Sequence, residues 1–239
     1  MIELFSASFI KLFIPPLLLP SFIKKFYKPL VYKNKFNYDN SLYNRGAFIN
    51  RSIIKLSSKG NRNFNLKYLE IGCEYNQIFN TIPLEKGMKI GVDPERGGTH
   101  RQTSDDFFKN NSTKFDLIFI DGLHTYEQCQ KDVINSLNFL NEGGIILLHD
   151  MLPQNSYEEK NHRSGDVWKV AVELQLSKNL EFKIANVDCG VGIIKPLPNH
   201  NYFKNDKLLN SKYNDFISHY FKDLQIVSCE EAFKFIDKD

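Results

Sequence analysis

The sequence lacks three features that would each define a class of protein. It has no cysteine pair at CxxC or zinc-ligand spacing, which argues against a zinc module or a redox motif. Its 239 residues carry a formal net charge of only +3, which argues against a surface that tracks nucleic acid. It has no uninterrupted apolar run of the ~20 residues that cross a bilayer. The scattered cysteines fit a reduced, cytoplasmic chain in which they remain free thiols: Cys73, Cys129, Cys189 and Cys229.

Residues 1–37 form an N-terminal arm that is apolar at first and then basic. The uncharged run from Leu12 to Ile23 has only twelve residues and is broken by three prolines, so it is too short to cross a membrane. The arm also lacks the basic leader and the small-x-small cleavage site of a signal peptide. Because six lysines and no acidic residue lie between Glu3 and Asp39, two interpretations are open. The arm contacts an anionic membrane surface, or it packs on the domain or on a partner subunit.

The rest of the chain alternates apolar runs with amphipathic stretches. Apolar residues from Leu42 to Leu56 recur at helical spacing and predict a helix that stops at Gly60. Four short apolar runs, each ending in polar residues, predict parallel strands with helices on both faces. They are "LKYLEIG", "MKIGVDPE", "KFDLIFIDG" and "GGIILLHD".

The segment after the fourth run completes this plan. "LEFKIANVDCGVGIIK" predicts two antiparallel strands joined by a turn. The polar stretch 152–165 is long enough to be a lid or a substrate rim. We therefore expect a domain over 38–199, followed by a helical extension over 200–239 that packs on it.

Polar side chains end all four predicted strands. Since ligands bind at the carboxyl ends of parallel strands, and a dry unpaired carboxylate costs several kcal/mol, so many polar ends together predict a ligand site. The residues at these ends are Glu70, Gly72, Asp93, Asp121, His124, His149 and Asp150.

The first strand is followed by "EIGCEYNQ", an incomplete nucleotide-binding turn. Glu74 and Asn76 stand where further glycines are expected, and Glu74 opposes a diphosphate by its charge. Asp93 follows about twenty residues later, where a carboxylate can accept both hydroxyls of a ribose. A cofactor with a ribose and no phosphate fits this turn, and S-adenosylmethionine is such a cofactor.

The run from Tyr68 to about Lys195 resembles the class I S-adenosylmethionine-dependent methyltransferases. Within that class it is similar to macrolide-sugar O-methyltransferases and to enzymes of surface-glycan gene clusters. The resemblance implies a Rossmann-like fold with a mostly parallel seven-stranded sheet, a C-terminal antiparallel hairpin and helices on both faces. It is carried by "YLEIG", "GVDPERGGTHRQTSDDFF", "FDLIFIDGLHTYEQ", "GGIILLHDMLP", "GDVWKV" and "DCGVGIIK".

The resemblance also implies a set of cofactor contacts. Glu70 and Gly72 would border the methionine part, with Asn76 in the same turn, and Asp93 would hold the ribose. Ser104 and Asp105, after a short third strand, would lie near the adenine, although Ser104 also suits a helix N-cap. Asp121 would lie beneath the transferable methyl group.

Methyl transfer to an alcohol requires a group that takes the hydroxyl proton. His124 follows Asp121 and the flexible Gly122, and a histidine titrates near neutral pH, so we expect it to act as general base with Asp121 and Asp150 beside it. In metal-dependent relatives, acids at the positions of Asp121, His149 and Asp150 hold magnesium. Because His149 replaces an acid here, a cation held by these three residues would more suitably be manganese than magnesium.

These observations predict an S-adenosylmethionine-dependent O-methyltransferase that acts on a hydroxyl group, with a glycan or another small molecule as substrate. We expect no nucleic-acid partner, self-association as in relatives, and a cytoplasmic location that includes the membrane surface if the arm binds there. Two alternatives are open. One is a non-catalytic cofactor-binding protein of a glycan cluster. The other is a nicotinamide-dependent sugar oxidoreductase, which the missing glycines and the missing Tyr-x-x-x-Lys pair disfavour.

Overall fold

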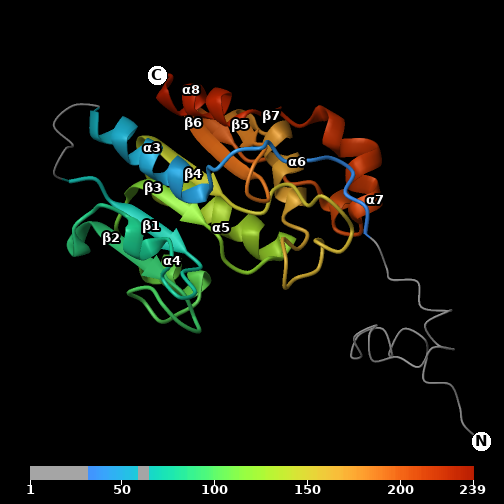
Figure 1. Ribbon diagram of the computed structural model, residues 1–239. Coiled ribbons are helices and arrows are strands. Elements are labelled where there is room, and N and C mark those ends of the chain that lie inside the picture. The colour runs from blue at the N-terminus through green and yellow to red at the C-terminus, as the bar shows by residue number, and fades with distance from the viewer. Residues whose placement is uncertain (1–31, 59–64) are drawn as a thin grey trace, which may run out of the picture. The chain divides into compact units, whose positions relative to one another are not determined.

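Within residues 32–58 and 65–239, the part of the chain that the computed structural model describes, seven strands form one central sheet. They are β1 (Tyr68–Ile71), β2 (Lys89–Val92), β3 (Phe115–Ile120), β4 (Leu140–Leu148), β5 (Lys178–Ala185), β6 (Val191–Asn201) and β7 (Ile226–Val227). Their order is β2-β1-β3-β4-β6-β5-β7 (Figure 1). The predicted strands are therefore confirmed, and the carboxyl ends of β1, β2, β3 and β4 lie at one edge of the sheet.

The sheet is mostly parallel. Strands β2, β1, β3 and β4 run parallel to one another, whereas β6 is antiparallel to both β4 and β5. This confirms the predicted fold class with its antiparallel hairpin. The seventh strand, β7, pairs with β5 and lies in the segment 200–239. The expected short strand before Ser104 is wrong, because only a single bridge between Val92 and His100 forms there.

Helices cover both faces of the sheet (Figure 1). One face carries α3 (Arg45–Ser58) and α8 (Cys229–Asp237), and the other carries α4 (Ser104–Asn110), α5 (Tyr126–Phe139) and α6 (Trp168–Leu176). The shorter elements are α7 (Tyr213–Asp215), η3 (Phe79–Thr81), η4 (Lys86–Met88), η5 (Asp206–Leu208), η6 (Phe216–Tyr220) and η7 (Phe221–Asp223).

Apolar periodicity determines how these layers pack. The side of α3 with Phe48, Ile53 and Leu56 is buried against the sheet, and this confirms the predicted helix. Leu42 was expected on the same side, but it precedes the helix and its side chain is fully exposed. The predicted stop at Gly60 lies outside the described residues. Trp168 at the start of α6 is completely buried and packs on Phe216, so it joins the helix to the C-terminal segment.

The end of the arm and the residues that lead from it to α3 are held against the loop that follows β4. The backbone N–H of Lys35 donates to the Gln154 carbonyl (2.8 Å), and the Tyr38 hydroxyl donates to the Leu152 carbonyl (2.5 Å). Most of the arm, residues 1–31, lies outside the described residues, so both interpretations of it stay predictions.

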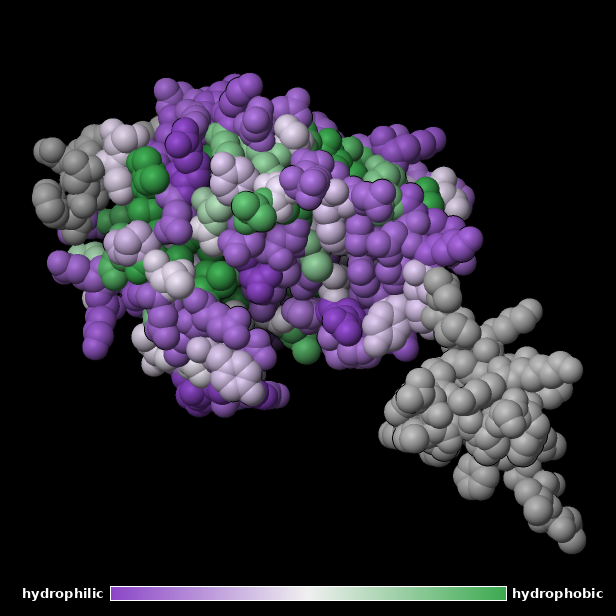
Figure 2. All heavy atoms as spheres, in the orientation of Figure 1, coloured by the Kyte–Doolittle hydropathy of each residue, from purple (hydrophilic) through white to green (hydrophobic). Residues whose placement is uncertain are grey.

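Across the described ranges, no helix has both the length and the apolar character to span a bilayer. The face in Figure 2 is largely hydrophilic over these residues, with separate hydrophobic areas.

Gly72 brings the ends of β1 and β3 together. Its φ angle is +83°, a left-handed conformation that suits glycine. A Cβ atom at this position would lie 2.0 Å from the Asp121 carbonyl oxygen. The glycine is therefore required for the close approach of the two strand ends.

Replacing Gly72 with alanine should lower the free energy of unfolding by at least ~2 kcal/mol, because both the backbone strain and the steric overlap oppose the native turn. Urea unfolding followed by circular dichroism measures this change. Gly87→Ala is the matched control, since a Cβ atom there meets nothing within 4 Å. Equal stability of the two variants would contradict the proposed role of Gly72.

Candidate active site

The turn after β1 keeps a left-handed backbone without further glycines. Glu74 and Asn76 have φ angles of 45° and 60°. The Asn76 side-chain oxygen accepts a hydrogen bond from the Gly98 N–H (2.7 Å), so the substituted residue ties this turn to the loop after β2. Asparagine tolerates this backbone better than most residues. The non-glycine sequence therefore still forms a nucleotide-type turn.

Asp93, at the end of β2, organises the same two loops. One carboxylate oxygen accepts the backbone N–H groups of Cys73 (3.0 Å) and Glu74 (2.9 Å), and the other accepts those of Glu95 (2.9 Å) and Arg96 (2.8 Å). Burial raises its pKa, but these four donors outweigh burial and leave the pKa below its usual value. Both carboxylate oxygens of Asp93 already accept hydrogen bonds from the two loops, so this residue shapes the turn. Its contact with a ribose stays a prediction.

Ser104 and Asp105 lie where α4 meets α5. Ser104 is the first residue of α4, and the N-cap is Thr103, whose side chain accepts from the Asp106 N–H. The Gln128 side-chain amide donates to Ser104 Oγ (3.1 Å) and to an Asp105 carboxylate oxygen (3.1 Å). The capping expectation for Ser104 is therefore wrong, and the adenine contact of both residues stays a prediction.

Glu70 is buried within β1. Its carboxylate accepts a hydrogen bond from the Tyr68 hydroxyl (2.6 Å), and only 1% of its surface is exposed. Burial raises the pKa of Glu70 to about 7, although the hydrogen bond from Tyr68 acts to lower it. The carboxyl group therefore titrates near neutral pH at the edge of the site.

Asp121, His124 and Asp150 converge just beyond β3 and β4. Nε2 of His124 lies 3.3 Å from a carboxylate oxygen of Asp150 and 3.7 Å from one of Asp121. Burial lowers the pKa of His124, but the hydrogen bond with Asp121 and the charge of Asp150 raise it above its usual value. Burial would raise the pKa of Asp121, yet its contacts with the two histidines and Arg45 hold it well below its usual range. The three predicted catalytic residues are therefore adjacent.

The loop after β4 fixes the ring of His124. Nδ1 of His124 contacts the Arg163 carbonyl oxygen, which can only accept, so this nitrogen carries a proton and Nε2 faces the carboxylates. A Cβ atom at Gly165 would lie 1.8 Å from the His124 carbonyl oxygen, which shows how closely the two loops approach. Asp166 then accepts the backbone N–H of Tyr126 (2.7 Å) at the start of α5. The predicted rim 152–165 therefore anchors the site as well as bordering it.

His149 is more buried than His124 and faces the same two carboxylate oxygens. Its Nδ1 is 3.2 Å from an oxygen of Asp121 and 3.2 Å from an oxygen of Asp150. Its Nε2 faces Arg45 Nη1 at 2.8 Å. Both ring nitrogens are therefore engaged by protein groups.

Two charged residues of this cluster were not predicted from the sequence. Arg45 begins α3, and Asp188 lies in the turn between β5 and β6. An Asp188 oxygen accepts the Arg45 backbone N–H (2.8 Å), and the side chains pair at 3.2 Å. A basic residue in the first turn of a helix interacts unfavourably with the helix dipole. This unfavourable position is the sequence feature that could have pointed to a role for Arg45. Asp188 stood only in a predicted turn, which gave no signal for a site.

Backbone strain concentrates around the same groups. Among the described residues, seven non-glycine residues have a positive φ angle, and five of these lie at the β1 turn, at the end of β4 or in the β5–β6 turn. Such conformations cost about 1–3 kcal/mol each and cluster at functional sites. The five are Glu74, Asn76, Asp150, Asp188 and Cys189.

Two sets of three side chains in this cluster could hold a cation, and one of them is His149, Asp150 and Cys189. Asp121, His124 and Asp150 offer ligand atoms that lie within 4.8 Å of one another. The backbone contact at Nδ1 of His124 resembles the support that metal-binding histidines receive. His149 fits less well than predicted, because Arg45 faces one of its nitrogens and two carboxylates face the other. A nitrogen ligand favours manganese over magnesium at this set.

Replacing Glu70 with glutamine should change the pH dependence of stability. The folded pKa of about 7 exceeds the ordinary 4.5, so the wild type loses stability as pH rises from about 4.5 to 7. The variant cannot ionise there, and relative to wild type it should gain ~1–3 kcal/mol between pH 5 and pH 8. Urea unfolding at both pH values tests this, with exposed Glu142→Gln as control. A variant whose stability parallels the wild type would argue against a raised pKa.

Comparison with known proteins identifies one part of the chain. Residues 84–151 match the profile of a family described as "Methyltransferase domain". That segment runs from the residues before β2 to the end of β4 and includes Asp93, Asp121, His124 and Asp150. None of the curated proteins matches the chain significantly.

Solved structures show distant similarity. An O-methyltransferase from Bacillus cereus in complex with S-adenosylhomocysteine is 11% identical, with 64% of this chain and 82% of that chain covered and a TM-score of 0.46. The O-methyltransferase TomG from Streptomyces achromogenes, in complex with S-adenosylmethionine, is 10% identical, with coverage of 63% and 78% and a TM-score of 0.47. MycE from the mycinamycin biosynthetic pathway, bound to Mg, S-adenosylhomocysteine and mycinamycin VI, is 14% identical, with coverage of 59% and 46% and a TM-score of 0.36.

The family match covers the three strand ends at which the sequence predicted the central part of the site. The sheet that carries them has the predicted mostly parallel order with its antiparallel hairpin. The predicted resemblance to methyltransferases is therefore confirmed over residues 84–151, which lie in a sheet of the predicted order.

Proposed function

We propose that the protein transfers the methyl group of S-adenosylmethionine to a hydroxyl oxygen, and that the hydroxyl belongs to a sugar. The observation that carries this proposal is the convergence of Asp121, His124 and Asp150 beyond β3 and β4, next to the β1 turn. A sulfonium is already a good electrophile, so an alcohol acceptor chiefly needs a base. The cluster offers an imidazole nitrogen between two carboxylates.

The proposed step is an in-line displacement. The acceptor oxygen attacks the methyl carbon, the carbon–sulfur bond breaks, and S-adenosylhomocysteine leaves with the electron pair on its sulfur. His124 takes the hydroxyl proton at Nε2, because its Nδ1 proton is already held by the Arg163 carbonyl. The resulting imidazolium lies 3.3 Å from Asp150, which stabilises its charge.

The negative charge of the cluster also suits the cofactor. Asp121 follows β3 and carries a carboxylate with a strongly lowered pKa, so it remains ionised beside the sulfonium. Its position beside Gly72 supports the predicted contact with the methionine end of the cofactor. A cation held by Asp121, His124 and Asp150 would lower the pKa of the acceptor hydroxyl. His124 cannot serve as ligand and base at once, because both roles use the lone pair on Nε2.

The sugar acceptor rests on the resemblance to macrolide-sugar and glycan-cluster enzymes. A lipid-linked or polymer-linked glycan would also suit a protein whose basic and apolar arm contacts the cytoplasmic face of a membrane. The loop 152–165, which adjoins His124, is the segment we expect to border such an acceptor. A cofactor-binding protein without activity would bind S-adenosylhomocysteine and methylate no member of a sugar panel.

Calorimetric titration should show saturable binding of S-adenosylhomocysteine and none of NAD. Asp93→Ala should abolish the binding, since four backbone N–H groups of the cofactor turn lose their acceptor. Asp223→Ala, at an exposed aspartate on η7, should bind as the wild type does. Preference for NAD would instead support the sugar oxidoreductase.

Replacing His124 with glutamine should lower kcat by ~10²–10⁴-fold, the usual contribution of a positioned general base, and leave S-adenosylhomocysteine affinity unchanged. The assay follows radioactive methyl transfer from S-adenosylmethionine to a panel of nucleotide sugars and methyl glycosides. His200→Gln, an exposed histidine at the far end of β6, is the control.

The same assay separates the base from a metal ligand. Treatment with EDTA should leave the wild-type rate unchanged, because Nε2 of His124 then remains available to the acceptor. A strict requirement for added manganese would assign that nitrogen to the cation and refute the general-base role.

A further inference from the structure

Arg45 is a partly buried cation among the carboxylates of the cluster, and it comes from outside the segment that matches the family. Its Nη1 is 2.8 Å from His149 Nε2, and its Nε is 3.4 Å from Asp121. Asp188 accepts a hydrogen bond from the same Nη1 at 3.2 Å. One side chain thus contacts three groups from three different segments of the chain.

The contact with His149 has a definite direction. A guanidinium has five N–H donors and no acceptor, and it stays protonated in proteins, so Nε2 of His149 must accept. Burial lowers the pKa of His149, but Asp121, Asp150 and Asp188 outweigh burial and raise it well above its usual value, so the close approach of Arg45 is what opposes a second proton on Nε2. Arg45 approaches Nε2 more closely than Asp188 does, at 2.8 Å against 3.5 Å, and therefore leaves the lone pair on this nitrogen. The ring proton then lies on Nδ1.

This proton lies between the two carboxylates that also face His124. Nδ1 is 3.2 Å from both Asp121 Oδ1 and Asp150 Oδ2. The N–H donates to Asp121, the Asp150 oxygen lies at the same distance from Nδ1, and both oxygens are within 3.7 Å of Nε2 of His124. Without a donor at Nδ1, two adjacent anions would repel each other and separate.

The turn that carries Asp188 has a strained backbone. Asp188 and Cys189 have φ angles of 48° and 59°, and Gly190 follows with 87°. The turn also accepts the N–H groups of Met151 and Leu152, directly after Asp150. Consecutive left-handed residues persist where surrounding structure holds them in place, and such strain is typical of functional sites.

We propose that Arg45, held by Asp188, is a positioning residue of the active site, which orients His149 so that its Nδ1–H donates to Asp121 beside Asp150 and keeps both carboxylates near His124. The consequence for catalysis rests on the proposed function, because it concerns the base and the carboxylates beside it. The orientation of His149 can be tested without any acceptor.

The first test is ¹⁵N NMR of the histidine side chains in the full chain, with the His149 signals assigned by their loss in His149→Gln. In the wild type, Nδ1 should be protonated and Nε2 should be an acceptor. In Arg45→Gln this state should be lost, because Nε2 then has only Asp188 as a neighbour and becomes protonated. Helix α3 should still form, since Asp188 caps it through the backbone N–H of residue 45.

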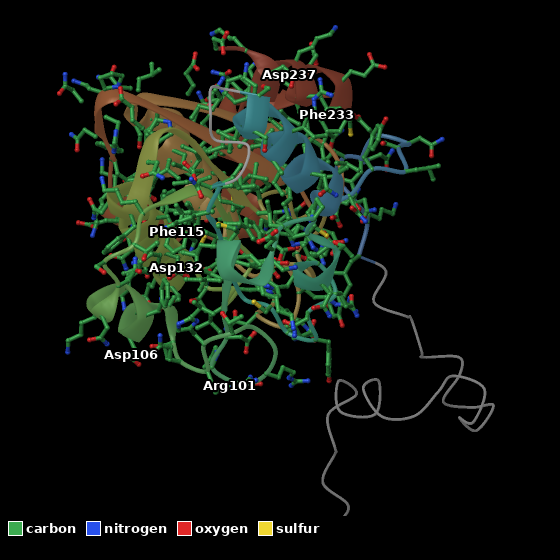
Figure 3. The ribbon with its side chains drawn as sticks, turned by 90° about the vertical axis from the view of Figure 1, so that its left-hand side faces the viewer. Arg101, Asp106, Phe115, Asp132, Phe233 and Asp237 are labelled. Atoms are coloured by element: carbon green, nitrogen blue, oxygen red, sulfur yellow. The ribbon has the colours of Figure 1, made fainter. Side chains whose placement is uncertain are left out.

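Arg51→Gln is the matched control. Arg51 lies on the same helix and pairs with Asp237 of α8, labelled in Figure 3, away from the cluster. This variant should keep the wild-type His149 signals. A wild-type spectrum with both nitrogens of His149 protonated, or an Arg45→Gln spectrum equal to the wild type, would overturn the proposal.

The second test is methyl transfer to the acceptor found in the sugar panel. Arg45→Ala should lower kcat by about 10- to 100-fold, the effect of a small misplacement of reacting groups, with the KM for S-adenosylmethionine unchanged. Added guanidinium ion should restore part of both the rate and the wild-type His149 signals. A loss of rate that guanidinium does not restore, with unaltered NMR signals, would mean that Arg45 only stabilises the fold. If no acceptor is methylated, the proposed function fails, while the NMR result still decides the orientation of His149.

Discussion

The repulsion among three carboxylates is the constraint on which the site depends. Asp121, Asp150 and Asp188 come from three different segments and all lie around His149. Such a cluster is stable only if donors and cations occupy the spaces between its members. Here the two histidines and Arg45 supply them. The sheet and its loops bring the acids together, and one of the three groups that offset their repulsion, Arg45, comes from outside the family match.

The turn after β1 shows how a left-handed backbone can be stabilised without further glycines. Phosphate-binding turns use glycines so that the backbone can approach a ligand closely. This chain keeps the left-handed φ angles at Glu74 and Asn76 and stabilises them with side-chain and carboxylate hydrogen bonds. Asp93 alone accepts four N–H groups, two from each loop. Hydrogen bonds with other protein groups therefore hold the turn in its left-handed conformation.

The sequence predicted the sheet well because each strand is a short apolar run that ends in polar residues. It also predicted which strand ends meet, since parallel strands present their carboxyl ends at one edge. It could not predict Arg45 or Asp188, because their association depends on a helix start and a hairpin turn that are 143 residues apart. It assigned Ser104 as a cap one residue too late, since Thr103 offers the same chemistry.

The contacts of Lys35 and Tyr38 with residues 152–154 set a limit on how the chain can be shortened. These contacts hold the start of the loop whose far end fixes His124 through Arg163. A protein that begins at Asn34 would keep both contacts, whereas one that begins at Asp39 would lose them. A shortened protein should therefore begin no later than Asn34 if the loop beside His124 is to keep this support.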